Sequence, residues 1–255
     1  MDETLAPPPH HAPVFIDDFS RGLDEERWIA HYLPQWTVPE RSQARYSIVE
    51  AGLQLRIESD QLDWREEDAP LRVSNVQTAV FSGAIGSTRG THRHRPDGLE
   101  VRTEMPSRQL FAPTRGRIDL TVAATTDEGC MLAAWLVGTE QRSEEDAGEI
   151  CIFEIDADAI STTTRARTGI KAHHDPSLMT DMAEVVLPFD ASEMHTWTVI
   201  WGDGETVIGC EGRVLRRIAQ SPDYPMMLLI DLFEIGAPSG GYPKTAVISE
   251  VRAWC

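Results

Sequence analysis

The stretch Gly148-Glu149-Ile150-Cys151-Ile152-Phe153-Glu154-Ile155 decides how the rest of the chain is interpreted. Its Ile, Cys and Phe residues favour an extended strand with at least one buried face, and two carboxylates are placed within that strand. Side chains five positions apart point to opposite faces of a regular strand, because the alternation has a period of two. The two glutamates can therefore serve one site only if the strand contains a bulge.

A bulge of one residue would restore the parity. Glu149, Cys151 and Glu154 would then share a face, while Ile150 and either Ile152 or Phe153 would pack behind it. Long side chains leaning inward on a concave sheet could bring the two carboxyl groups to about 5 Å, the separation at which one carboxylate attacks a sugar and the other protonates the leaving oxygen. The alternative is that these are two unrelated glutamates on a half-exposed strand.

The hexapeptide Glu149–Glu154 resembles the catalytic strand of glycoside hydrolase family 16, whose pattern is Glu-x-Asp-x-x-Glu with a bulge before the last Glu. The resemblance implies that Glu149 is the nucleophile and Glu154 the general acid and base. Cys151 stands where the family has its middle Asp, so the assisting role of that Asp does not carry over cleanly. A thiol is a poor acceptor and is largely neutral at pH 7, so we expect a slower enzyme.

Two further strands resemble the family and supply candidates for sugar contact. Met131–Val137 is similar to a strand that family members write Trp-Pro-Ala-Phe-Trp-Leu-Leu, which implies that Met131 and Trp135 face the substrate. Trp135 is a candidate sugar platform, because an indole covers the apolar face of a pyranose, with a core tryptophan as the alternative. In the stretch from Tyr224, similar to Tyr-Pro-Met-x-Leu-x-Leu-Asn-Leu-Trp, Asp231 and Phe233 take the two positions that face the sugar.

The remaining candidate sugar ligands are cationic or imidazole side chains. The stretch from Gly86 to Pro96 is basic. Within it, His92, Arg93, His94 and Arg95 could line the cleft and donate hydrogen bonds to hydroxyls, or could belong to an exposed loop. Lys171 and His173 share one face if their strand continues, near where relatives carry a cleft histidine. A surface location is the alternative for both residues.

Short alternating segments separated by turns, with almost no helix, predict an all-β fold with two antiparallel sheets packed as a sandwich. The resemblance runs in family order from Val14 to Trp254 and implies a jelly roll of the concanavalin A-like type, with a cleft on the concave sheet. Besides those already described, the expected strands are 46–58 as a hairpin, 76–85, 99–105, 117–124, 161–172, a meander of 184–187, 196–201, 206–210 and 214–218, and 246–254.

The chain has 255 residues, of which 41% are hydrophobic, and no linker-like segment divides it. We therefore expect a single domain over residues 14–255, preceded by a disordered Pro- and His-rich leader over residues 1–13. The leader lacks the apolar core of a secretory signal, and no run approaches the eighteen or so apolar residues of a membrane span. We expect a soluble protein, cytoplasmic as given, or secreted if its signal has been removed.

Lys and Arg total 23 and Asp and Glu total 41, so the net charge is 23 minus 41, or −18. Such a charge repels phosphate backbones and anionic membranes, so neither nucleic acid nor a membrane is an expected partner. An oligo- or polysaccharide is the expected partner, bound by a monomer. The four cysteines lack the spacing of a zinc site or a disulfide framework, so we expect free thiols and no cofactor. Asp17 and Asp18 could help hold a structural calcium, as in some relatives, or could be solvated acids.

The leading hypothesis is a retaining β-glycoside hydrolase, endo-acting on a polysaccharide of the β-glucan or galactan type, which works through a glycosyl-enzyme. A non-catalytic carbohydrate-binding protein on the same fold is the first alternative. Cys151, Met131, Asp231 and Phe233 all depart from the family at the cleft, which loss of catalysis would allow. A transglycosylase shares the covalent intermediate, and the sequence does not separate it from a hydrolase.

Overall fold

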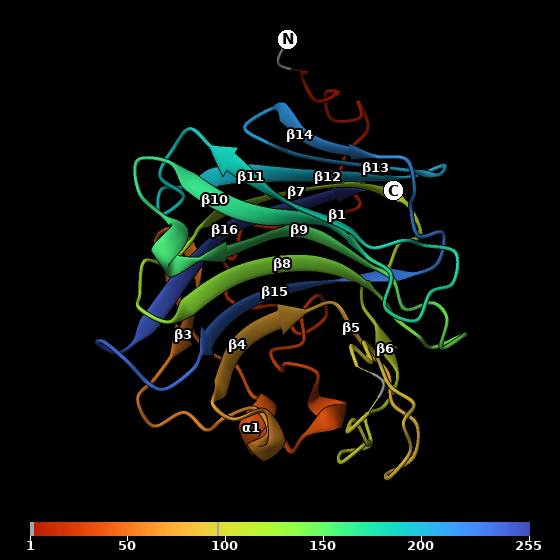
Figure 1. The fold of residues 1–255 in the computed structure, drawn as a ribbon, viewed down its shortest axis with the longest axis vertical. Helices are drawn as coiled ribbons and strands as arrows, with labels where there is room; N and C mark the ends of the chain where they lie inside the picture. Colours follow the sequence, from red (N-terminus) through yellow and green to blue (C-terminus); the bar gives the residue numbers. More distant parts are fainter. Residues whose placement is uncertain (1–2, 96) are drawn as a thin grey trace.

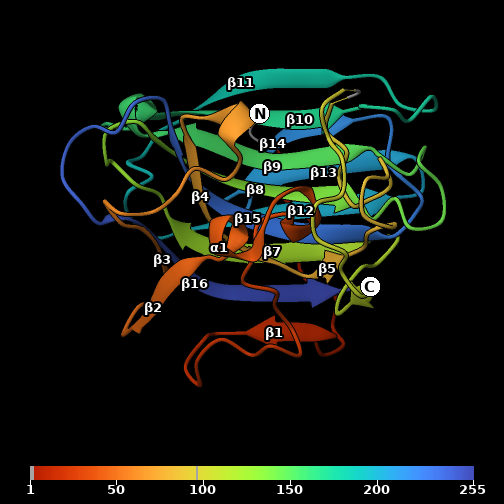
Figure 2. The same cartoon turned by 90° about the horizontal axis from the view of Figure 1, so that it is seen from below.

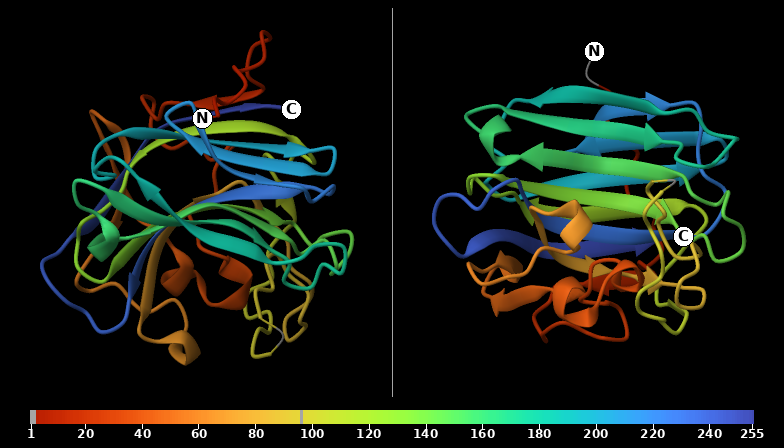
Figure 3. Two further views of the ribbon diagram at one scale, coloured as in Figure 1. Left: turned by 45° about the horizontal axis from the view of Figure 1, so that its top comes forward. Right: turned by 60° about the horizontal axis from the view of Figure 1, so that its bottom comes forward.

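The computed structural model describes residues 3–95 and 97–255, and its regular structure is almost wholly antiparallel strands (Figure 1). Met1 and Asp2 of the expected leader, and Pro96 of the basic stretch, lie outside the described residues. Among the described residues, a sheet of eight strands and a sheet of six strands pack face to face (Figure 3). The predicted all-β sandwich is confirmed.

The larger sheet has the strand order β14-β13-β12-β7-β16-β3-β2, and β1 pairs with β16. Its strands are β1 (Phe15–Asp17), β2 (Arg45–Val49), β3 (Gly52–Ile57), β7 (Gly116–Ala123), β12 (His195–Gly202), β13 (Glu205–Cys210), β14 (Arg213–Ile218) and β16 (Lys244–Trp254).

The smaller sheet has the strand order β11-β10-β9-β8-β15-β4, and it carries the candidate catalytic strand, β9. Its strands are β4 (Leu71–Gln77), β8 (Cys130–Gly138), β9 (Glu149–Asp156), β10 (Thr164–Lys171), β11 (Asp181–Leu187) and β15 (Met226–Ile235). The other elements are a small strand pair, β5 (Ala79–Val80) with β6 (Arg108–Gln109), the helix α1 (Pro39–Ser42), and the 3-10 turns η1 (Pro34–Trp36), η2 (Glu66–Asp68) and η3 (Ala157–Ala159).

Alternation along β8 divides its side chains between two apolar clusters. Leu132 and Ala134 lie in the core between the sheets, whereas Met131, Ala133 and Trp135 belong to a second cluster. This parity is the predicted one, and it follows from the period of two along an extended chain. The second cluster therefore lies on the outer face of the six-stranded sheet.

Loops cover part of that outer face. Tyr32, Trp36 and Trp64 are buried there and share the second cluster with Trp135 and Phe233. In Figures 1 and 2, α1 and the β5–β6 pair lie beneath the arch formed by β8, β9 and β15. Segments from the first 111 residues thus cover the outer face of the sheet on the side of β15 and β4.

Three expectations about strands are wrong. Residues 76–85 form no single strand, because they contain the end of β4, a bend at Thr78 and the short β5, which belongs to another sheet. Residues 99–105 form no strand, because Leu99 and Val101 turn inward into the second cluster while the Val101 amide donates to the Ser87 carbonyl in a neighbouring loop. The segment 184–187 is part of β11, which pairs with β10 in the smaller sheet rather than joining β12 to β14. Alternation identifies a strand but does not identify its partner.

Part of the segment expected to be disordered contacts the larger sheet. Leu5 is buried, its amide donates to the Gly212 carbonyl at 2.9 Å, and Thr4 forms an isolated bridge with Arg213 of β14. The open edge of β14 offers unpaired backbone groups, and one apolar side chain packs against it. Arg117 also donates to the Ala6 carbonyl.

The four cysteines lie among the described residues and are free thiols, three of them buried and Cys255 exposed. Within the described chain, we find no helix whose length and apolar character would let it cross a bilayer.

Candidate active site

The strand β9 contains the predicted bulge. Along β8, Ala134 pairs with Phe153 and Trp135 pairs with Cys151, so Ile152 has no partner in that register. Ile152 and Phe153 are both fully buried in the core between the sheets. One extra residue in β9 therefore changes which side chains reach the outer face.

The bulge in β9 also disturbs its pairing with β10, the neighbouring strand on the other side. Arg167 pairs with Glu154 and Gly169 pairs with Cys151, so Thr168 alone faces two residues of β9. The Thr168 hydroxyl lies 3.0 Å from the Cys151 carbonyl and 3.1 Å from the carbonyl of the next residue. A buried hydroxyl thus satisfies backbone acceptors that the bulge leaves outside the regular ladder.

The bulge places Glu149, Cys151 and Glu154 on one face. One carboxylate oxygen from each glutamate and the Cys151 Sγ all lie within 4.8 Å of one another, and all three residues are buried. This separation is close to the roughly 5 Å between the two carboxyl groups of retaining glycosidases. The geometry anticipated from the hexapeptide is present.

The ammonium group of Lys171 lies between the two carboxylates. Its Nζ lies 2.9 Å from Glu149 Oε1 and 2.7 Å from Glu154 Oε1, and 5.5 Å from the centre of the Trp135 ring. Burial would lower the pKa of Lys171, but the two carboxylates raise it above its usual value. The ammonium is therefore charged at neutral pH and offsets the repulsion between the glutamates.

Glu149 is ionised at neutral pH. Burial by itself raises the pKa of this carboxyl, but a hydrogen bond from His173 and the positive charge of Lys171 lower it to about 2. His173 Nε2 lies 2.8 Å from Glu149 Oε2, and His92 Nε2 lies 3.9 Å from the same oxygen. These are the properties that a nucleophilic carboxylate needs.

Glu154 has a different set of partners. Trp135 donates its indole N–H to Oε1 at 3.2 Å, and Arg167 donates from Nε to Oε2 at 2.9 Å. Arg167 also pairs with Asp156, so its guanidinium links the Glu154 carboxylate to the carboxylate at the end of β9. Sequence reasoning missed Arg167. The available signal was the register, because a bulged β9 brings residue 167 of the next strand opposite Glu154.

Cys151 is neutral in this environment. Burial, followed by the charges of Glu154 and Glu149, raises the pKa of its thiol well above the usual value. Its Sγ lies 3.6 Å from the Arg167 carbonyl, which is a weak contact. Cys151 therefore fills the space between the glutamates without adding charge.

The aromatic and polar candidates on β8 and β15 line the same face but are largely covered. The exposed fractions are 8% for Met131, 7% for Trp135 and 4% for Phe233. Asp231 is fully buried and accepts a hydrogen bond from Asn75 Nδ2 at 2.7 Å, and burial raises the pKa of this carboxyl well above its usual value. Sugar contact by these four candidates stays a prediction.

The basic stretch brings His92 to the site rather than leaving it on an exposed loop. His92 is buried, and its ring centre lies 5.3 Å from that of His173 and 5.4 Å from that of His94. Glu140, from the loop after β8, accepts a hydrogen bond from the Arg93 amide at 2.7 Å. Burial raises the pKa of Glu140 to about 8. Glu140 was not recognised in the sequence, because its neighbours are distant in the chain.

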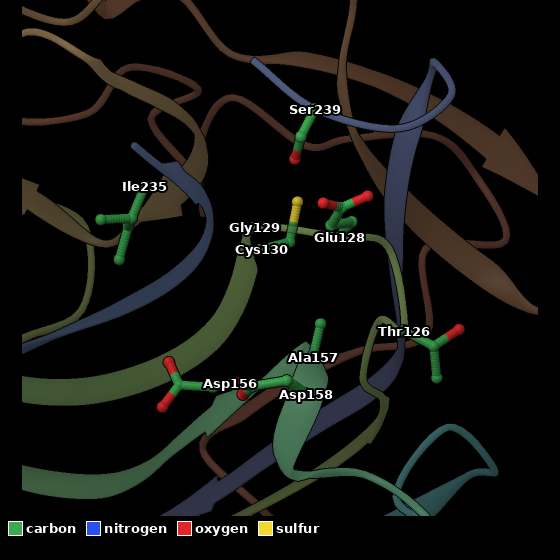
Figure 4. A pocket seen from close by; sticks show the side chains of 9 residues that line it. All are labelled: Thr126, Glu128, Gly129, Cys130, Asp156, Ala157, Asp158, Ile235 and Ser239. Carbon is green, nitrogen blue, oxygen red and sulfur yellow. The ribbon is translucent and has the colours of Figure 1, made fainter. Parts of the chain in front are cut away.

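Solvent reaches the carboxylates from the β10 side. The side chains of Arg167 and Lys171 are 42% and 29% exposed. The two cations are thus more exposed than the carboxylates that they contact. Where β8 begins and β9 ends lies a hollow of about 610 Å³ whose lining includes Asp156, the second partner of Arg167, together with Glu128 and Asp158 (Figure 4).

The aspartates considered for calcium have protein partners. Asp17 accepts hydrogen bonds from the Phe19 amide and the Trp28 indole, and Asp18 accepts from the amide and hydroxyl of Ser20. A structural calcium there stays a prediction.

A scan against family models finds no match, and neither does a comparison with curated proteins. Among solved structures, the GlcNAcα1-4Gal-releasing endo-β-galactosidase of Clostridium perfringens is 23% identical, with a TM-score of 0.83. The match covers 99% of this chain and 65% of that one, so the chain spans about two thirds of that protein's length.

Two glucanases are also similar. A non-specific endo-β-1,3(4)-glucanase from family GH16 is 15% identical with a TM-score of 0.68, and the match covers 99% of this chain and 98% of that one. The catalytic domain of an endo-1,3-β-glucanase from Thermotoga petrophila is 14% identical with a TM-score of 0.64, over the same shares of the two chains. At these identities the comparisons show the fold, and they confirm the resemblance to glycoside hydrolase family 16 at that level.

Proposed function

We propose that this protein is a retaining β-glycoside hydrolase. The observation that carries the proposal is that a bulge in β9 sets Glu149 and Glu154 on one face, with carboxylate oxygens within 4.8 Å of each other. Two carboxyl groups at this spacing suit a double displacement, whereas inverting enzymes need about 6.5–9.5 Å to accommodate a water molecule.

In the first step the ionised Glu149 attacks the anomeric carbon, and its oxygen forms a bond to that carbon as the glycosidic C–O bond breaks. Glu154, carrying a proton, gives that proton to the departing oxygen. His173 and Lys171 hold Glu149 ionised and fixed in position. The pre-organised carboxylate lowers the entropic cost of the attack.

To act as the general acid in the first step, Glu154 must give up its ion pairs and take up a proton. In the free protein it contacts both Lys171 and Arg167. Both cations lie at the exposed side of the site, where an entering sugar can take over their hydrogen bonds. We infer that substrate binding loosens these pairs and frees Glu154 to carry a proton.

In the second step Glu154, now a carboxylate, removes a proton from water, and the water oxygen displaces Glu149 from the anomeric carbon. The product then has the configuration of the substrate. If a sugar hydroxyl takes the place of water, the same steps give transglycosylation.

The substrate class follows from the fold likeness and is part of the proposal. Similar solved structures include an endo-β-galactosidase and endo-β-glucanases. A β-glucan or a β-galactan cleaved within the chain is therefore the substrate to test first. The covered Trp135 and Phe233 leave room for sugar stacking only where the overlying loops move.

The test is incubation with β-1,3- and β-1,4-linked gluco-oligosaccharides and β-linked galacto-oligosaccharides, with products read by mass spectrometry and their anomeric configuration by NMR. Shorter products with retained configuration, absent in Glu149→Gln, support the proposal. Longer products indicate a transglycosylase. Binding without products across the panel indicates a carbohydrate-binding protein, and inverted products contradict the assigned roles.

A further inference from the structure

A second arrangement of donor atoms overlaps the carboxylate pair. One ring nitrogen from each of His92 and His173 and a carboxylate oxygen of Glu149 all lie within 4.8 Å of one another. The three residues come from three separate parts of the chain: the loop that contains residue 92, strand β9, and the turn after β10. The side chains are 6% exposed for His92, 3% for Glu149 and 15% for His173.

The two oxygens of Glu149 are divided between different partners. Oε1 faces the Lys171 ammonium at 2.9 Å, whereas Oε2 lies 2.8 Å from His173 and 3.9 Å from His92. Because a carboxylate only accepts, His173 donates its Nε2 proton in the resting state. Because Lys171 contacts only Oε1, the other oxygen, Oε2, faces the two imidazole nitrogens.

Two imidazoles and one glutamate are a donor set that zinc takes in proteins, with a fourth position open to water. Ligand atoms bonded to a tetrahedral zinc at about 2.0–2.2 Å lie roughly 3.3 Å from one another. The observed distances of 2.8 Å and 3.9 Å from Glu149 Oε2 bracket that value. Two of the three ligand-to-ligand distances are therefore within about 0.6 Å of that value, and the two histidine ring nitrogens lie within 4.8 Å of each other.

We propose that His92, His173 and Glu149 Oε2 bind a divalent transition-metal ion of the Zn²⁺ class. For Nε2 of His173 to bind the ion, the imidazole proton moves from Nε2 to Nδ1, and water fills the fourth position. Lys171 keeps its contact with Oε1. The cluster of Glu149, Cys151 and Glu154 is a poorer choice, because the Lys171 ammonium already lies between its two carboxylates.

The bound ion would prevent Glu149 from acting as the nucleophile. This consequence rests on the proposed function. Zinc on Oε2 withdraws charge from the carboxylate and occupies the space beside the anomeric carbon. Zn²⁺ is then a reversible inhibitor, and a chelator restores activity.

The primary test is zinc binding to the metal-free full chain, measured by isothermal titration calorimetry and by the zinc content of the dialysed protein. We expect one ion for each chain. His92→Ala and His173→Ala should each weaken binding by about tenfold or more, since loss of even an outer-shell partner of a metal site costs about 10–100-fold. The double variant His10→Ala/His11→Ala is the matched control, because these exposed histidines lie far from the site in sequence and should not change the stoichiometry.

The outcomes separate the site from the function. One ion for each chain that is lost in both site variants supports the site, even if no sugar on the panel is cleaved. If the protein cleaves sugar but binds no zinc, and zinc does not inhibit the cleavage, the metal site is overturned and the proposed hydrolase activity is unaffected. If either alanine variant fails to fold, anomalous X-ray scattering from zinc in crystals of the unaltered chain decides: a peak between His92 and His173 supports the proposal, and a peak only elsewhere overturns it.

Discussion

Lys171 lies opposite Glu149 in the register of β10 and β9, and its ammonium contacts Glu154 as well. A single cation from the neighbouring strand thus joins the two carboxylates of the site. In the family pattern a middle Asp stands between the glutamates, and here Cys151 is neutral. We infer that Lys171 takes over part of the task of fixing the two carboxylates relative to each other.

Replacing Lys171 by Met should disturb both carboxylates. Without the ammonium, the pKa of Glu149 should rise from about 2, because an opposite charge within 4–6 Å lowers a carboxyl pKa by about 1–3 units. We expect kcat/KM to fall by about tenfold or more and its acidic limb to move to higher pH. The measurement is a pH profile of kcat/KM.

Arg165→Met is the control for Lys171→Met. Arg165 lies on the same strand with a side chain 58% exposed and pairs only at 3.6 Å with Glu184. An equal change in both variants would mean that the effect is one of overall charge rather than of the bridge.

Replacing Cys151 by Asp should accelerate turnover. The new carboxyl would lie near Glu149 and Glu154 in a buried place, where like charges favour its protonated form, so that it can donate a hydrogen bond to Glu149. We expect kcat to rise by about tenfold, less than the roughly 10²–10⁴-fold of a general acid or base, because the introduced carboxyl would assist Glu149 without transferring a proton to the substrate. Comparison with Cys151→Ala on the same substrate separates the acid from lost packing, and equal rates in the parent and the Asp variant would show that this position is irrelevant to catalysis.

Replacing Thr168 by Val should loosen the bulge. The change keeps the shape but removes the hydroxyl that donates to the two carbonyls of β9, at a cost of about 1–3 kcal/mol for buried acceptors left unpaired. Because the bulge sets the carboxyl spacing, kcat should fall together with stability. Urea unfolding and initial rates measure the two effects.

Thr164→Val is the matched change in the same strand. Thr164 is buried and its hydroxyl bonds the Phe189 carbonyl and the Ala191 amide, away from the bulge. We expect a similar loss of stability with kcat unchanged. If kcat falls equally in both variants, the bulge has no special link to catalysis.

Glu140 should make stability depend on pH. Its pKa is raised to about 8 in the folded state from 4.5, so the folded chain holds a proton that the unfolded chain releases. Its contribution is fully present below about pH 4.5 and is lost as the pH rises toward 8. One pKa unit corresponds to about 1.4 kcal/mol, so Glu140→Gln should stay more stable than the parent at pH 8 by at least that amount.

The measurement is the free energy of unfolding at pH 5 and pH 8 for the parent, Glu140→Gln and Glu144→Gln. Glu144 is in the same loop and its side chain is 51% exposed, so its variant should follow the parent. A parallel pH dependence in all three proteins would contradict a buried, protonated Glu140.

The sequence by itself determined the strands and the faces on which their side chains lie. Alternation with a period of two placed Met131 and Trp135 on one side of β8, and the parity conflict between Glu149 and Glu154 required a bulge that the structure contains. These are local properties of an extended chain, so they can be inferred from residue order.

Only the tertiary structure decided which distant residues meet. Arg167 lies opposite Glu154, Lys171 reaches both glutamates, and His92 arrives from a loop more than fifty residues earlier in the chain. It also assigned β11 to the smaller sheet and showed that loops cover Trp135. Strand pairing and loop packing depend on contacts between parts of the chain that are far apart, and no local pattern encodes those contacts.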